Sequence, residues 1–209
     1  ANMFPVAFGL APEENYPEIR EFLISRGMAC SPGMSMYLFN AFYEMGADDY
    51  VLDLITAETD RSWMNMIRFG TTVTSEAWDL KYKQNMTWNH AWGAIPAYVI
   101  SRKICGIEPL EPSFRTMRIK PHPSDLEWAS IKHPTIRGAV EVDFERSEGS
   151  FKMNITIPPN SQSDVYVPLD FQDYTLMHNG ETIQGEELEK FVLVRDVKPG
   201  PHSFELTRI

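Results

Sequence analysis

The chain is poor in cysteine, and it has no apolar stretch long enough to cross a membrane. Its 209 residues include two cysteines, Cys30 and Cys105, which form neither a disulfide framework nor the spacing of a metal site. We interpret both as buried thiols, because free cysteine is among the most buried residue types. The first residues do not resemble a signal peptide. These features do not identify the compartment in which the protein works.

Basic residues are also scarce. The sequence has 19 Lys and Arg against 29 Asp and Glu, so its formal net charge at pH 7 is −10. Phosphates and anionic lipids are bound by basic surfaces, so we expect no nucleic-acid partner and no membrane partner. The P-loop, the dinucleotide fingerprint and zinc signatures are absent as well. We therefore predict no cofactor and no metal.

One stretch concentrates residues that carry chemistry. Residues 70–79 read Gly-Thr-Thr-Val-Thr-Ser-Glu-Ala-Trp-Asp, and Asn89 and His90 follow shortly after. Three threonines and a valine after a glycine favour a loop or extended backbone over a helix. Aromatic faces stack on sugar rings, while carboxylates and imidazole hold hydroxyls or move protons. This composition is typical of a carbohydrate site, with Glu76 as its candidate functional residue.

The same residues also have structural interpretations. His90 begins a helix and could equally cap it or lie in the core. Trp63, Trp88 and Trp92 each suit a core position better than a site, and Asp79 could simply cap a turn. The remaining histidines stand apart from carboxylate clusters, and we interpret them as surface or turn residues: His122, His133, His178 and His202.

The apolar pattern divides the chain into two parts. Up to residue 109 it predicts helices punctuated by glycines. The first begins after Pro12 or at Asn15 and stops at Gly27, the third begins at Asp48, and the others cover about 35–46, 62–70 and 91–105. Pro96 should kink the last helix or make its first turn irregular. Short turns between helices imply antiparallel helical hairpins packed side by side.

From residue 110 onward the apolar period is two, as in Val140, Val142 and Phe144. Similar runs occupy 151–157, 165–169 and 204–206, and Glu148-Gly149 and Asn179-Gly180 are turn signals between strands. The prediction is a two-domain α + β chain, with helical hairpins over 1–109 and an antiparallel β-sandwich over 110–209.

Several segments, taken in order, resemble bacterial α-L-rhamnosidases. Residues 7–13 are similar to that family's Ala-x-Gly-Leu-x-Pro-Glu, and 62–67 to its Ser-Trp-Gly-x-Met. Residues 70–78 resemble its Gly-x-Thr-Thr-x-Trp-Glu-x-Trp segment, and 88–93 its Asn-His-x-x-x-Gly segment. Residues 106–109, 119–121, 157–160 and 165–168 are similar to the joint into its C-terminal sandwich and to the sandwich itself. The resemblance covers most of the chain.

This resemblance implies the closing part of a six-hairpin (α/α)6 toroid followed by a C-terminal β-sandwich. Members of the family hydrolyse terminal α-L-rhamnosyl bonds with inversion of configuration. On the matching positions, Glu76 would be the general base, and His90, Trp78 and Trp63 would bind a rhamnose-containing saccharide. The family's general acid lies upstream of the segment that residues 7–13 match. The resemblance therefore implies a C-terminal portion that does not turn over substrate alone, and whose uncovered apolar face favours self-association.

Three departures concern specificity. Ser75 stands where the family usually has Trp, the loop from Glu76 to His90 is shorter than in typical members, and residues 31–34 replace the usual Thr-Gly-Phe. Two alternatives remain open: another six-hairpin glycosidase with a different glycone, and a non-catalytic sugar-binding or assembly module in which the sandwich binds.

Overall fold

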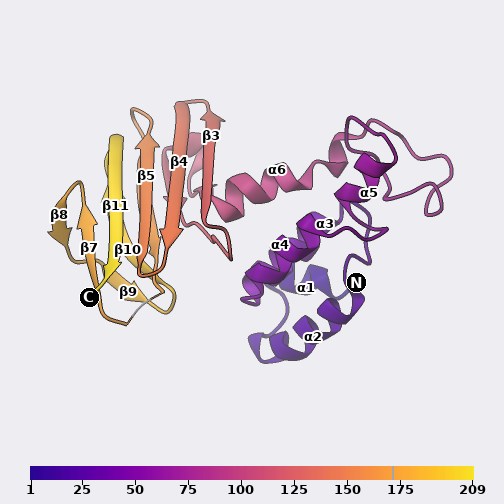
Figure 1. The fold of residues 1–209 in the computed structure, drawn as a ribbon, viewed down its shortest axis with the longest axis horizontal. Coiled ribbons are helices and arrows are strands. Elements are labelled where there is room, and N and C mark those ends of the chain that lie inside the picture. Colours follow the sequence, from indigo (N-terminus) through magenta and orange to yellow (C-terminus); the bar gives the residue numbers. More distant parts are fainter. Residues whose placement is uncertain (171) are drawn as a thin grey trace. The chain divides into compact units, whose positions relative to one another are not determined.

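The computed structural model describes residues 1–170 and 172–209 (Figure 1). The chain forms two compact units, Ala1–Val99 and Ile100–Ile209. The first unit is helical and the second is built of β-strands. No helix in the described part of the chain is long and apolar enough to span a bilayer.

The helices of the first unit pack around α3, which contacts α1, α4 and α6. Its buried side chains, among them Leu38, Phe39 and Phe42, form the centre of the helical core. The elements are α1 (Met3–Ala7), η1 (Glu13–Asn15), α2 (Tyr16–Arg26), α3 (Ser35–Glu44), α4 (Asp48–Thr56), α5 (Trp63–Arg68), η2 (Ala91–Gly93) and α6 (Ile95–Val99).

Four of the expected helices are confirmed as α2 to α5. Helix α5 begins where its cap predicts, because the Ser62 hydroxyl accepts a hydrogen bond from the Asn65 amide at 3.0 Å. Helix α2 ends at Gly27, whose φ of 55° suits a residue without a side chain.

The expected helix over 91–105 is broken into three pieces. A 3₁₀ turn at Ala91–Gly93 comes first, then α6 (Ile95–Val99), and then a π-helical turn, η3 (Ile100–Ile104), in the second unit. Pro96 lies in the first turn of α6, where its missing N–H costs no helical hydrogen bond. The first turn of this helix is therefore irregular, as the proline predicts.

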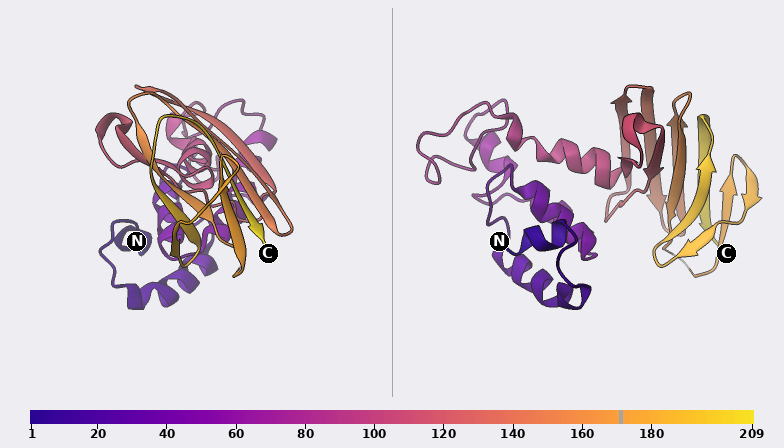
Figure 2. Two further views of the ribbon diagram at one scale, coloured as in Figure 1. Left: turned by 90° about the vertical axis from the view of Figure 1, so that its left-hand side faces the viewer. Right: turned by 180° about the vertical axis from the view of Figure 1, so that it is seen from behind.

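The second unit is a sandwich of two sheets (Figure 2). Within the described residues, the strand orders are β1-β2-β6-β10-β9 and β3-β4-β5-β11-β7-β8. The strands are β1 (Ile107–Pro109), β2 (Thr116–Ile119), β3 (Trp128–Thr135), β4 (Gly138–Ser147), β5 (Ser150–Ile157), β6 (Gln162–Pro168), β7 (Tyr174–His178), β8 (Glu181–Ile183), β9 (Glu186–Leu188), β10 (Phe191–Val197) and β11 (Gly200–Arg208), with the short 3₁₀ turn η4 (Pro112–Phe114) between β1 and β2.

The sandwich core follows the period-two pattern of the sequence. Strands β4 and β5 bury every second side chain, and Phe144 stacks on Phe151 with ring centroids 5.5 Å apart. Residues Asn179 and Gly180, with φ of 52° and 81°, turn the chain between β7 and β8. The predicted sandwich is confirmed.

One strand pair is not antiparallel, since β2 and β6 run parallel. The chain between them passes through β3, β4 and β5 of the other sheet, and it returns beside β2 in the same direction.

Two histidines that were expected at surface or turn positions are partly exposed and lie against each other on neighbouring strands. His178 ends strand β7, and its ring stacks on Phe204 with centroids 4.4 Å apart. Its Nε2 lies 2.9 Å from Nδ1 of His202 in β11. Burial, with the charge of His202 second, lowers the pKa of His178. The register of β7 against β11 places His178 opposite Phe204, a long-range property that no local pattern shows.

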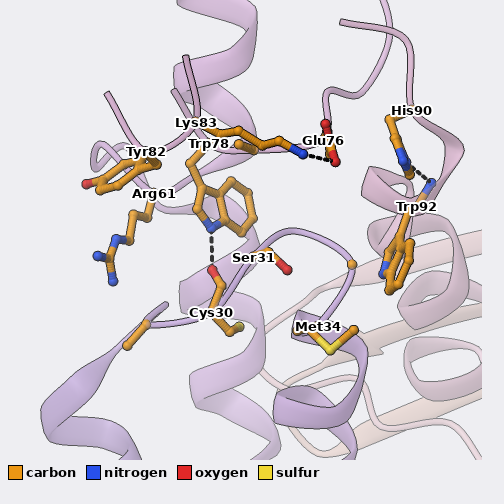
Figure 3. A pocket seen from close by; sticks show the side chains of 13 residues that line it. Cys30, Ser31, Met34, Arg61, Glu76, Trp78, Tyr82, Lys83, His90 and Trp92 are labelled. Carbon is orange, nitrogen blue, oxygen red and sulfur yellow. Dashed lines mark hydrogen bonds and ion pairs between the residues drawn. The ribbon is translucent and has the colours of Figure 1, made fainter. Parts of the chain in front are cut away.

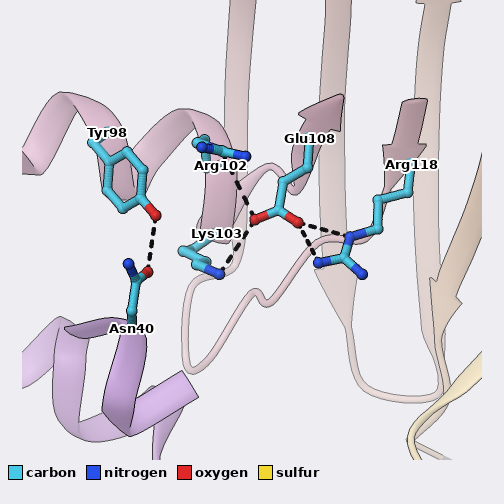
Figure 4. Close-up of polar contacts among 6 residues, drawn as sticks. All are labelled: Asn40, Tyr98, Arg102, Lys103, Glu108 and Arg118. Carbon is cyan, nitrogen blue, oxygen red and sulfur yellow. Dashed lines mark hydrogen bonds and ion pairs between the residues drawn. The ribbon is translucent and has the colours of Figure 1, made fainter. Parts of the chain in front are cut away.

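Partly buried polar contacts occur in each unit (Figure 4). In the first unit, the Tyr98 hydroxyl donates to Asn40 Oδ1 at 2.8 Å and links α6 to α3. In the second, the Glu108 carboxylate of β1 accepts from Arg118 Nε at 2.7 Å and from Lys103 Nζ at 3.3 Å. Arg102 Nε lies 3.9 Å away. This charged cluster ties the π-helical turn to β1 and β2.

Candidate active site

A pocket of about 510 Å³ opens in the helical unit (Figure 3). Its lining comes from three places: residues 29–34 between α2 and α3, Arg61 before α5, and the segment 76–92 between α5 and α6. Ligand pockets for small molecules typically measure about 300–1,000 Å³. The volume therefore suits a small saccharide.

The loop that carries Glu76 is held by its own backbone. The Glu76 amide donates to the Thr87 carbonyl at 2.9 Å, and the His90 amide donates to the Thr74 carbonyl at 2.8 Å. The Thr74 hydroxyl donates back to the His90 carbonyl at 2.9 Å. These bonds pair the two ends of the loop, so that Glu76 and His90 line the same pocket.

Two donors hold the Glu76 carboxylate. Lys83 forms an ion pair with Oε1, and the Thr87 amide donates to Oε2 at 3.0 Å. The hydrogen bond from Lys83, and second the bond from Thr87, lower the pKa of Glu76. Glu76 is therefore ionised at neutral pH, which suits a proton acceptor and not a proton donor.

Trp78 forms a wall of the pocket and Trp63 supports it from behind. The Trp78 indole N–H donates to the Cys30 carbonyl at 2.6 Å, and the side chain is almost fully buried. Trp63 meets it edge-on, with centroids 4.8 Å apart and planes at 89°. The Trp63 N–H donates to the Gly93 carbonyl at 2.7 Å. Trp78 thus lines the pocket, whereas Trp63 does not.

His90 and Trp92 form the opposite side of the pocket from Tyr82 and Arg61 (Figure 3). His90 Nδ1 accepts from the Trp92 amide at 3.3 Å. Trp92 is 54% exposed and lies over Gly33, where an added Cβ would come within 1.3 Å of the indole ring. The expectation that Trp92 and Trp88 lie in the core is wrong. Both sit on a loop or 3₁₀ turn, and Trp88 is 44% exposed outside the pocket.

The sequence did not single out three charged or aromatic side chains of the pocket: Arg61, Tyr82 and Lys83. Lys83 follows Glu76 by seven residues in an irregular loop, a spacing that no local pattern connects with an ion pair. Asp79 caps a turn, as its alternative interpretation stated, by accepting from the Lys81 amide at 2.9 Å.

Ser75, the unusual neighbour of Glu76, does not line the pocket. It is 1% exposed, and its hydroxyl donates to the Ala77 carbonyl at 3.1 Å.

Burial raises the pKa of the Cys30 thiol to about 11, so this thiol at the pocket wall is protonated at neutral pH. In the described residues, no group of three or more His, Cys, Asp or Glu is placed to hold a metal ion.

Comparison with known proteins identifies the family. Residues 1–104 match the bacterial alpha-L-rhamnosidase 6 hairpin glycosidase domain, and residues 106–181 match the bacterial alpha-L-rhamnosidase C-terminal domain. The chain belongs to the bacterial α-L-rhamnosidase family. Its helical unit is accordingly part of a six-hairpin glycosidase domain, followed by the family's β-sandwich.

Relatives of this chain are much longer than it is. An alpha-L-rhamnosidase of Formosa agariphila is 26% identical over 227 residues, covering 97% of this chain and 24% of the relative. The structure of the alpha-L-rhamnosidase from Dictyoglumus thermophilum matches with a TM-score of 0.88 at 26% identity, over 99% of this chain and 25% of that one. The Streptomyces avermitilis alpha-L-rhamnosidase, solved with L-rhamnose, has the same fold at 21% identity and a TM-score of 0.80, over 98% of this chain and 21% of that one. The chain thus spans about a quarter of the length of these relatives.

Proposed function

We propose that the protein containing this chain removes terminal α-L-rhamnose from saccharides or glycosides by inverting hydrolysis, with Glu76 as general base. The observation that carries the proposal is an ionised carboxylate, held by Lys83 and the Thr87 amide, in a pocket walled by tryptophan and histidine. In this role Glu76 accepts a proton from the water that attacks the anomeric carbon.

The other pocket side chains take binding roles in the proposal. Trp92 offers an exposed indole face on which the apolar face of a sugar can stack, and His90 beside it can hold a hydroxyl. Trp78 closes the wall next to Glu76. Trp63 acts through Trp78, because it contacts that ring and not the pocket.

The general acid comes from outside the pocket residues described above. An inverting glycosidase needs two carboxyl groups about 6.5–9.5 Å apart, with room for a water between base and sugar. Among the described residues that line the pocket, Glu76 is the single carboxylate. We therefore propose that residues 1–209 alone do not turn over substrate, and that the acid belongs to the longer protein typical of this family.

The test is hydrolysis of an aryl α-L-rhamnoside by the full-length protein, with the wild type compared with Glu76→Gln. Loss of a general base should lower kcat by about 10²–10⁴ while the fold is retained. Glu58→Gln is the matched control, because Glu58 pairs with Arg68 outside the pocket and its variant should keep wild-type activity.

Three results would contradict parts of the proposal. Full activity of Glu76→Gln would make Glu76 structural. A wild type that cleaves other aryl glycosides but no rhamnoside would indicate a different glycone. Proton NMR of the first-formed sugar reports stereochemistry, and a product that retains its anomeric configuration would exclude inversion.

A further inference from the structure

Arg61 lines the pocket and has no acidic partner among the residues that the structure describes. The segment from Glu58 to Lys83 contains four basic side chains, and three of them form ion pairs: Arg68 with Glu58, Lys81 with Asp60 and Lys83 with Glu76. Arg61 forms none with any described residue. It lines the pocket all the same, in a chain whose net charge is −10.

The contacts of Arg61 hold its position but leave its charge uncompensated. The guanidinium carbon lies 4.7 Å from the centre of the Tyr82 ring. Its Nη1 reaches the Met28 carbonyl at 3.5 Å, the long limit of a hydrogen bond. The cation–π contact with Tyr82 helps to fix the guanidinium, whose remaining N–H donors have no acceptor among the described residues and can bind a ligand.

The place of Arg61 in the pocket indicates what it could bind. Figure 3 shows Arg61 and Tyr82 on one side, His90 and Trp92 on the other, and Glu76 and Trp78 between them. At about 510 Å³ the pocket exceeds what a single pyranose ring fills. A sugar stacked near Trp92 with its anomeric carbon at Glu76 would leave the Arg61 side for the next sugar residue of the substrate. Tyr82 is 43% exposed and can contribute part of an aromatic face there.

We propose that Arg61 and Tyr82 form a subsite for an acidic sugar residue, the one to which the terminal rhamnose is attached. A guanidinium presents parallel N–H donors that match the two oxygens of a carboxylate or of a sulfate ester. The substrate class is therefore a rhamnosyl group on a uronic acid or on a sulfated sugar. This inference rests on the proposed function, because it assigns the neighbour of the sugar that Glu76 acts on.

The experiment compares matched substrates on the full-length protein. The first is a rhamnosyl-uronate disaccharide, the second is the same disaccharide with its carboxyl group reduced to an alcohol, and the third carries a sulfate ester on the reduced residue. We expect wild-type kcat/KM to be on the order of tenfold higher for at least one acidic substrate than for the neutral one, as for a hydrogen bond to a charged group. The preferred acidic substrate distinguishes carboxylate from sulfate.

Variants assign the preference to Arg61. Arg61→Met should abolish the ratio between acidic and neutral substrates, and Arg61→Lys should keep part of it, because the charge remains while the planar fork is lost. Arg68→Met is the matched control, since it removes the same charge outside the pocket and should leave the ratio as in the wild type. Raising the ionic strength should lower the wild-type ratio and leave that of Arg61→Met unchanged.

Two outcomes would overturn the subsite. One is a wild type without preference for either acidic substrate. The other is an Arg61→Met variant that loses the same factor on acidic and neutral substrates, which would give Arg61 only a structural role at Met28. If the wild type hydrolyses no rhamnoside at all, the proposed function fails separately. Binding of free hexuronate and of a sulfated hexose, followed by tryptophan fluorescence, then decides the subsite: Arg61-dependent binding supports it, and absence of binding refutes it.

Discussion

The charged cluster around Glu108 allows a quantitative test of what holds the β-sandwich to the helical turn before it. The Glu108 side chain is 11% exposed and contacts Lys103, Arg118 and Arg102. We expect Glu108→Gln to destabilise the second unit, because it leaves three cations around an uncharged amide. Removing one partner of a buried ion pair costs about 3–5 kcal/mol. The arginine side chains are 39% exposed and can recover hydration, so we expect about 2 kcal/mol.

The pH dependence gives a second readout of the same cluster. Burial alone would raise the pKa of Glu108, but the charges of Lys103 and Arg118 outweigh it and hold that pKa below its ordinary value. A carboxyl with a lowered pKa in the folded state adds stability above its unfolded pKa, and that stability is lost as the pH falls through the folded pKa. The difference between wild type and Glu108→Gln should therefore shrink in the acidic range.

The assay is urea unfolding of the 209-residue chain followed by far-UV circular dichroism, with hydrogen exchange of the β1 and β2 amides. Glu111→Gln is the matched control, because Glu111 pairs with Arg115 on the surface and its loss should cost less than about 0.5 kcal/mol. For a unit of this size, about 2 kcal/mol corresponds to a decrease in Tm of roughly 8 °C. Equal effects of the two variants, or a difference that is unchanged at low pH, would refute the reasoning.

Two further changes test the candidate active site and the turn between η3 and β1. Lys83→Met should raise the pKa of Glu76 and move the acidic limb of the full-length protein's kcat/KM profile to higher pH, because Glu76 in its proposed role as base is inactive when protonated. An unmoved limb would mean that Lys83 does not hold Glu76 in solution. Gly106→Ala should destabilise the second unit by about 3 kcal/mol, since φ is +73° and the new Cβ would lie 2.0 Å from the Lys120 backbone. Gly180→Ala is the control, because Gly180 also has a positive φ, +81°, but no atom lies within 4 Å of the added Cβ, so only the backbone strain remains. Equal losses of stability for the two variants in urea unfolding would argue against a steric clash at Gly106.

Much of the fold follows from local patterns in the sequence. The glycine-ended helices and the alternating strands β4 and β5 were predicted correctly because the period of buried side chains, 3.6 or 2, is set by backbone geometry. Ser62 illustrates the same point at one residue, since a serine before an apolar periodic segment caps the helix that follows. The broken helix after Ala91 was predicted only in part: Pro96 signals an irregular first turn, but nothing local signals the π-helical turn at Ile100–Ile104.

The pocket shows the limit of such patterns. By itself the sequence determined the segment, Glu76 to His90, and the family to which its motifs belong. Only the tertiary structure decided that Lys83 pairs with Glu76 and that Trp92 lines the pocket while Trp63 stays behind Trp78. It also decided that Arg61 lines the pocket without an acidic partner among the described residues. Motifs record residue types in order, whereas these pairings depend on how loops 29–34 and 76–92 close against each other. That closure rests on hydrogen bonds between residues more than ten positions apart, such as Trp78 to Cys30, which no local periodicity encodes.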